Sequence, residues 1–193
     1  DPQDAASYCG RAVAKKLQGD SAGALADCAR AIEAEPENGW SYFTRGCLQY
    51  EMRQWPEALA DFKQALGRDP GLTEYTRSRI YLVRSRLGEE VAAREELSVY
   101  RKARPLLKGE DWADKVLGFL CGEVPEKDFL QTAPSSSAGK RCEAAFYAGA
   151  KRLIQGDQSG AASLFRKCLE SGQKAYYEYR SSQAELDAIK AGK

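Results

Sequence analysis

The chain has 193 residues, 43% of them hydrophobic, with 29 basic and 28 acidic side chains and no histidine. A net charge near zero argues against a nucleic-acid partner, and the missing histidine excludes the Ser-His-Asp and Cys-His arrangements of nucleophilic catalysis. No apolar run approaches the about 18 residues of a membrane-spanning helix, so no transmembrane segment is expected. These features predict a non-catalytic protein without a cofactor.

Two segments near the N-terminus repeat each other. Residues 24–36 read A-L-A-D-C-A-R-A-I-E-A-E-P, and residues 58–70 read A-L-A-D-F-K-Q-A-L-G-R-D-P. The same shift aligns further pairs, namely Tyr8 with Tyr42, Arg11 with Arg45 and Ala12 with Gly46. Small residues at fixed positions let two helices approach closely. The pattern predicts helical hairpins over residues 5–37 and 38–71.

Weaker forms of the repeat continue along the chain. Ala93 and Leu97 align with Ala58 and Phe62 of the second hairpin, which predicts a third hairpin over residues 73–105. A shorter hairpin is expected over residues 109–134, and the small residue Gly149 helps to define a further one over residues 141–171. A final helix over residues 174–190 is expected to cap the exposed apolar edge of the last hairpin.

These positions resemble the tetratricopeptide repeat family. Its small residues match Ala12 and Gly46 in the first helices and Ala24 and Ala58 in the second, and Pro70 closes its repeat as the family's proline does. The resemblance implies an all-α fold, a right-handed superhelix of about four to five hairpins with a C-terminal capping helix. It implies one domain over residues 1–193, and a scaffold or adaptor that holds a protein or peptide segment in a concave groove.

The C-terminal third resembles bacterial NlpI-type tetratricopeptide proteins more narrowly. Residues 142–170 and 178–186 carry this resemblance, together with Trp112 and Gly122 of the short hairpin. Proteins of that group are exported and often lipid-anchored, and the best known is a homodimeric adaptor of the outer membrane. The resemblance therefore implies a periplasmic or envelope-associated protein, although a cytoplasmic one stays open. A self-associating homodimer without a peptide groove is the alternative function.

The family rule for the concave face selects the groove residues. They are Cys9 and Val13 in the first hairpin, Trp40, Phe43, Cys47 and Tyr50 in the second, and Tyr75, Ser78, Arg79, Leu82 and Arg86 in the third. A groove built from them would be aromatic at its centre and basic on one side, and both features favour partner binding. The alternative is that the aromatic rings form packing contacts inside the hairpins.

Residues 77–108 contain nine basic and four acidic side chains. This excess predicts either a solvated helix face with intrahelical ion pairs or a docking patch for an acidic partner. Two other arginines are expected to form structural ion pairs, because an antiparallel hairpin places Arg11 opposite Asp27 and Arg45 opposite Asp61.

The six cysteines include no C-x-x-C motif, and without histidine they do not form a zinc site, so no metal is expected. Cys142 and Cys168 lie at similar distances from Gly156, where the predicted hairpin turns, so their side chains are placed to meet. A disulfide between them would add about 3 kcal/mol and require an oxidising compartment. The alternative is that cysteines such as Cys28 serve as small buried apolar residues.

Overall fold

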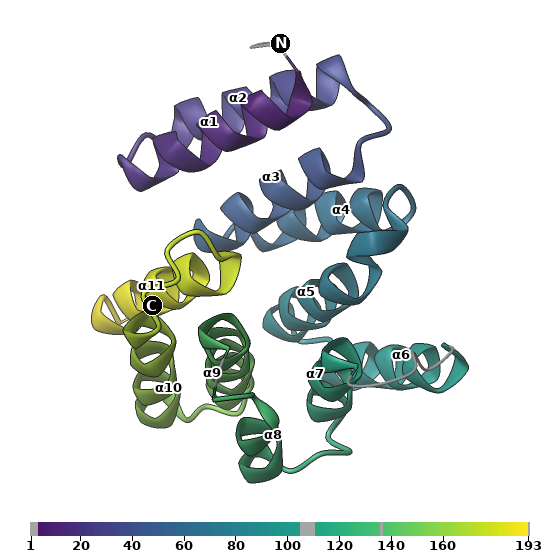
Figure 1. Ribbon diagram of the computed structural model, residues 1–193, viewed down its shortest axis with the longest axis vertical. Coiled ribbons are helices and arrows are strands. Elements are labelled where there is room, and N and C mark those ends of the chain that lie inside the picture. Colours follow the sequence, from purple (N-terminus) through teal and green to yellow (C-terminus); the bar gives the residue numbers. More distant parts are fainter. Residues whose placement is uncertain (1–3, 105–110, 136, 193) are drawn as a thin grey trace. The chain divides into compact units, whose positions relative to one another are not determined.

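A computed structural model describes residues 4–104, 111–135 and 137–192. These residues form eleven α-helices and one 3-10 turn and contain no strand, which confirms the predicted all-α class (Figure 1). None of the described helices is long and apolar enough to cross a membrane. The chain divides into two compact units, Asp1–Val83 and Arg84–Lys193. The single domain and the continuous superhelix stay predictions.

The N-terminal unit contains two complete helical hairpins. The first pairs α1 (Ala5–Leu17) with α2 (Ser21–Ala34), and the second pairs α3 (Gly39–Glu51) with α4 (Trp55–Leu66). α3 packs against both helices of the first hairpin. A 3-10 turn (Pro70–Leu72) then leads into α5 (Thr73–Arg86), whose last turn belongs to the second unit.

Local sequence explains where these helices begin and how closely they pack. The side chain of Asp4 accepts a hydrogen bond from Ser7 N at the start of α1, and Asp20 accepts one from Gly23 N at the start of α2. Both are N-caps, which satisfy backbone groups that a helix leaves unpaired. A Cβ atom on Gly46 would lie 2.8 Å from the ring of Phe62. A side chain at this position would push the Phe62 ring away, so glycine lets α3 and α4 pack this closely.

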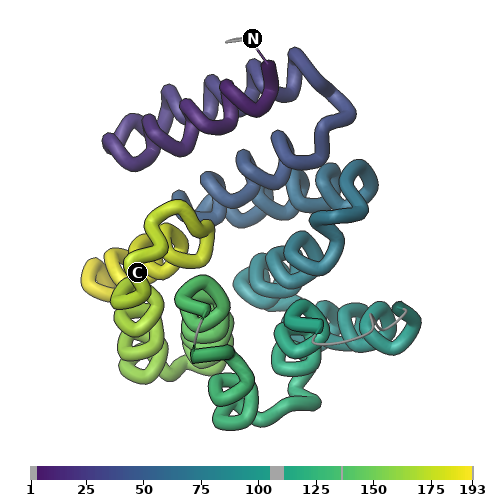
Figure 2. Tube along the Cα trace, viewed as in Figure 1, coloured from purple at the N-terminus to yellow at the C-terminus, as the bar shows by residue number. Residues whose placement is uncertain are grey.

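The C-terminal unit contains six further helices. They are α6 (Glu90–Ala103), α7 (Trp112–Cys121), α8 (Glu126–Thr132), α9 (Ala138–Ile154), α10 (Gln158–Glu170) and α11 (Tyr177–Lys190). α9 and α10 form an antiparallel hairpin (Figure 2), and α11 packs against both. The capping helix thus begins at Tyr177 rather than at residue 174, because residues 172–176 form the turn that precedes it. The expected ends at 105 and 109 lie outside the described residues.

The hairpin of α9 and α10 repeats the close packing seen in the N-terminal unit. A Cβ atom on Gly149 would lie 2.7 Å from the ring of Phe165. The turn residue Gly156 has a φ of +86°, and Asp157 accepts a hydrogen bond from Gly160 N as the N-cap of α10. The same sequence signals therefore produce the same local geometry in both units.

Candidate functional site

Most of the predicted groove residues are buried instead of lining a groove. Phe43 and Tyr50 are 3% and 1% exposed, and Cys47 and Arg79 are 0% exposed. The ring of Phe43 lies 5.8 Å from Trp40 and 5.7 Å from Phe62. Their expected exposure on a concave face is therefore wrong, because these side chains are used in packing.

Tyr50 and Arg79 also pack on each other. The guanidinium of Arg79 lies 5.4 Å from the centre of the Tyr50 ring, and that ring meets Trp55 edge to face at 5.1 Å. A buried cation above an aromatic face is a favourable pairing. Both residues consequently stabilise the fold of the N-terminal unit, and neither offers an exposed contact.

The remaining predicted groove residues differ in their surroundings. Trp40 and Tyr75 are each 39% exposed, whereas Cys9, Ser78 and Leu82 are buried, and Val13 is half-buried. In the C-terminal unit, Nη2 of Arg86 lies 2.7 Å from Oε1 of Glu185, which is buried. The charge of Arg86 is therefore paired within the fold. Only Trp40 and Tyr75 keep the exposed aromatic surface that the groove prediction requires.

Both expected ion pairs are present in the N-terminal unit. Arg11 donates from Nε and Nη2 to the two carboxylate oxygens of Asp27, at 2.7 and 2.8 Å. Arg45 does the same to Asp61 at 2.6 and 2.7 Å. Lys15 and Arg30 also contact Asp27, and the hydrogen bonds from Arg11 above all hold the pKa of that carboxyl well below its usual range.

Most of the arginines in the basic segment are also paired with carboxylates. Arg84 contacts Glu89 and Glu96, Arg94 contacts Glu90, Arg101 contacts Asp114 and Glu123, and Arg104 contacts Asp111. Lys108 lies outside the described residues. The pairing favours a solvated helix face with ion pairs over a docking patch for an acidic partner, because carboxylates of the same unit neutralise these cations.

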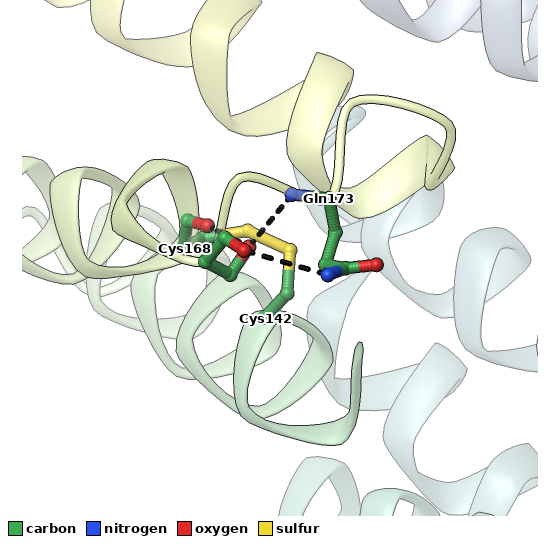
Figure 3. Close-up of a disulfide and its surroundings, with 4 residues drawn as sticks. Cys142, Cys168 and Gln173 are labelled. Atoms are coloured by element: carbon green, nitrogen blue, oxygen red, sulfur yellow. Dashed lines mark hydrogen bonds between the residues drawn. A yellow bond between two sulfur atoms is a disulfide. The ribbon is translucent and has the colours of Figure 1, made fainter. Parts of the chain in front are cut away.

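A disulfide joins Cys142 of α9 to Cys168 of α10, with their Cα atoms 4.2 Å apart (Figure 3). Both residues are buried. Next to the bridge, Ser171 Oγ donates to the carbonyl of Cys168 at 2.5 Å and accepts from Gln173 N at 3.3 Å. The bridge holds the start of α9 against the end of α10, and the hydrogen bonds of Ser171 order the turn that follows α10.

The other four cysteines are free thiols, and three of them are buried: Cys9, Cys28 and Cys47. Burial raises the pKa of Cys28 to about 12 and that of the half-buried Cys121 to about 11. Because the thiolate is the reactive form, these pKa values make both residues poor nucleophiles. In the described part of the chain, no three cysteine, aspartate or glutamate side chains lie together in a metal-binding group.

A pocket of about 410 Å³ opens beside the disulfide, between α8, α9 and α10. Ligand pockets in proteins usually measure about 300 to 1,000 Å³. We call it the α8–α10 pocket. It is lined by Leu130, Ala133, Arg141, Ala144, Ala145, Leu164, Lys167, Glu170 and Ser171. Arg141 and Lys167 each directly precede a cysteine of the bridge, so the disulfide holds two walls of the pocket together.

The lining combines an apolar floor with a charged rim. Leucine and alanine side chains form the floor, and Arg141, Lys167 and Glu170 are exposed at the rim. Arg141 donates from Nη1 to the carbonyl oxygens of Pro134 and Ser135. Sequence reasoning missed this site because residues 131–140 have the composition of a linker, and no motif brings them onto α9 and α10.

No protein-family profile matches this chain. A stretch of 68 residues is 40% identical to tetratricopeptide repeat protein 36 of Homo sapiens. The match covers 33% of this chain and 36% of the human protein, so it spans about a third of each. Together with the all-helical structure, it supports a tetratricopeptide-like protein. The narrower resemblance to NlpI-type proteins finds no counterpart in this match.

Proposed function

We propose that this chain is a non-catalytic interaction module that docks a segment of a partner protein in the α8–α10 pocket. The carrying observation is the pocket itself, where an apolar floor between three helices lies open beside exposed charged groups. Such a combination is typical of binding sites, since apolar burial supplies affinity and a few polar groups orient the ligand. Similarity to a tetratricopeptide protein also favours protein binding over catalysis.

The pocket replaces the concave groove as the centre of this proposal. Most of the groove residues are occupied in packing or pairing within the units, as Phe43 and Arg86 illustrate. The pocket instead has small side chains at Ala133, Ala144 and Ala145, which leave room for side chains of a partner. Self-association through another surface is the competing function.

A pocket-filling variant tests the proposal. Ala133 is half-buried and follows the end of α8, so Ala133→Trp should occupy the pocket without disturbing the helices. Ala6→Trp, on the exposed face of α1, is the matched control. A phage-displayed peptide library is selected on the wild-type protein, and the enriched peptides are then titrated against all three proteins.

We expect the selected peptides to bind wild type and Ala6→Trp equally and Ala133→Trp at least about tenfold more weakly, a loss of about 1.4 kcal/mol. Melting temperatures check that both variants fold. Failure to enrich any peptide would count against the proposal, and so would equal binding to all three proteins.

We also propose that the protein works in an oxidising compartment, such as the cell envelope. The support is the buried bridge between Cys142 and Cys168, because structural disulfides persist where thiols are not kept reduced. The test is thiol titration of denatured protein purified without reductant. Four reactive thiols are expected, in agreement with the four free cysteines of the structure, and six would refute the bridge.

A further inference from the structure

We infer that the segment held in the α8–α10 pocket is acidic, with aliphatic side chains entering the pocket and neighbouring carboxylates facing Arg141 and Lys167. This inference rests on the proposed function and adds the chemistry of the partner. It follows from the charges at the rim, the way they are held and the apolar floor beneath them.

The cations at the rim differ from four other arginines of the C-terminal unit. Arg84, Arg101, Arg104 and Arg152 each contact a carboxylate of the same unit. Arg141, in contrast, donates to two neutral carbonyl oxygens, those of Pro134 and Ser135. Within the residues that the structure describes, neither Arg141 nor Lys167 has a carboxylate at ion-pair distance. Their positive charge is therefore available to a ligand.

The position of Arg141 is also restrained. Its bonds to the segment after α8 hold the guanidinium at the rim, so little side-chain freedom is lost when a carboxylate binds. A guanidinium has five N–H donors and matches a carboxylate in shape. Arg141 lies in the first turn of α9 (Ala138–Ile154) and Lys167 in the last turn of α10, so the positive and negative helix ends at the rim offset each other and the side-chain charges decide the preference.

One lining residue opposes this preference. Glu170 at the end of α10 is exposed and contributes a negative charge to the rim. Two cations against one carboxylate still leave a positive rim. A basic segment would meet net repulsion there, whereas an acidic one would be attracted. Lys140 is not counted, because its ammonium group lies 5.9 Å from the ring of Trp112 and does not line the pocket.

The apolar floor of the pocket determines which side chains of the bound segment can lie between its carboxylates. Leu130 and Leu164 form its apolar surface, and Ala144 and Ala145 leave space above α9. An aliphatic side chain removes apolar surface from water on entering such a site. A segment that alternates aliphatic and acidic residues satisfies the floor and the rim together.

The experiment compares three labelled twelve-residue peptides by fluorescence anisotropy. Each contains two leucines, which are flanked by glutamates in the first peptide, by glutamines in the second and by lysines in the third. The protein is used as wild type, as Arg141→Gln with Lys167→Gln, and as Arg166→Gln with Lys190→Gln. The last pair is the matched control, since both residues are exposed and lie outside the pocket.

The glutamate peptide should bind the wild-type protein at least about fivefold more tightly than the glutamine peptide does, a difference that two exposed ion pairs can supply. The lysine peptide should bind most weakly. The preference should disappear in the pocket variant, survive in the control and weaken as salt is added. Equal binding of the glutamate and glutamine peptides, lost from both in Ala133→Trp, would overturn the acidic preference and leave the proposed function intact.

Two other outcomes would also overturn the inference. If no peptide binds while the phage selection succeeds, the partner is a protein segment of different chemistry. If decanoate displaces the glutamate peptide and itself binds more tightly, the pocket is a fatty-acid site and not a protein-docking site. Failure of the phage selection, by contrast, bears on the proposed function and not on the charge of the partner.

Discussion

In α3 and α4 of the N-terminal unit, Arg45 reaches across the hairpin to Asp61 at 2.6 Å. Gly46 and Phe62 of this hairpin have counterparts in Gly149 and Phe165 of α9 and α10, which pack in the same way. The same register places Ala148 and Leu164 where Arg45 and Asp61 stand. At this position the first hairpin has an ion pair, and the second has two buried apolar side chains.

A second position shows the same contrast. In α3 and α4, Gly39 lies against α4, and a Cβ atom on it would be 3.2 Å from the carbonyl oxygen of Ala65. The equivalent pair in α9 and α10 is the disulfide between Cys142 and Cys168. In α3 and α4 a small residue permits the close approach of the two helices. In α9 and α10 a covalent bond enforces this approach. The N-terminal hairpins should therefore respond to acid and the C-terminal hairpin to reductant.

Removing the bridge should have the largest effect on this contrast. Replacing both Cys142 and Cys168 by alanine opens a loop with a sequence separation of 26 residues. The chain-entropy model then predicts a loss of about 3.5 kcal/mol. Hydrogen exchange should show faster exchange in α9 and α10 and unchanged exchange in α1 to α4. Cys121→Ser is the control, and unchanged exchange in α9 and α10 would contradict the prediction.

The contribution of the ion pair is tested by replacing Arg45 and Asp61 with the apolar residues found at the equivalent positions of α9 and α10. Asp61→Leu leaves the half-buried Arg45 without its carboxylate and should cost about 3 kcal/mol in unfolding free energy. Arg45→Ala in the same chain copies Ala148 and Leu164 and should restore at least half of that loss, since apolar pairs often replace buried ion pairs well. Urea unfolding measures both. A double variant no more stable than the single one would show that the two hairpins are not interchangeable here.

Acid should weaken the first hairpin more than the hairpin of α9 and α10. Hydrogen bonds from Arg11, with further contacts from Lys15 and Arg30, lower the pKa of the buried Asp27 carboxyl. A lowered carboxyl pKa gives stability that is complete above the unfolded value of about 3.9 and is lost as pH falls below it. Asp27→Asn should therefore be less stable near neutral pH and show a flatter decline in acid. Urea midpoints measured across the acid range would reveal this, and parallel curves for wild type and variant would argue against it.

Sequence reasoning was most informative where the repeat fixes geometry. The spacing of Gly46 and Phe62 specifies a hairpin, and an antiparallel hairpin then places Arg45 opposite Asp61 and Cys142 opposite Cys168. Local periodicity is sufficient for such contacts, because both partners belong to one repeat.

The repeat pattern could not predict which side chains are exposed, nor could it predict the α8–α10 pocket. Whether Phe43 lines a groove or packs against Phe62 depends on side-chain volumes in neighbouring helices, which the family rule does not include. The α8–α10 pocket brings Leu130, Arg141 and Lys167 together from three helices and the turns between them. Part of that lining follows from how a linker-like segment folds back onto α9, and no repeat position encodes it.

The turns give the smallest and most exact comparison between the two units. Gly19 and Gly156 have a φ of +86°, and the equivalent turn of α3 and α4 has Arg53 at +61°. A left-handed conformation costs a residue with a side chain about 1 kcal/mol. Gly156→Ala should therefore lose about 1 kcal/mol of unfolding free energy. Since no neighbouring atom lies within 4 Å of the added Cβ, this loss is purely conformational.

Arg53→Gly should gain less unfolding free energy than Gly156→Ala loses, because it also removes a guanidinium that lies 5.1 Å from the ring of Trp55. Urea unfolding of both variants measures the two signs, and a destabilised Arg53→Gly would mean that stacking on Trp55 outweighs the backbone strain at this turn.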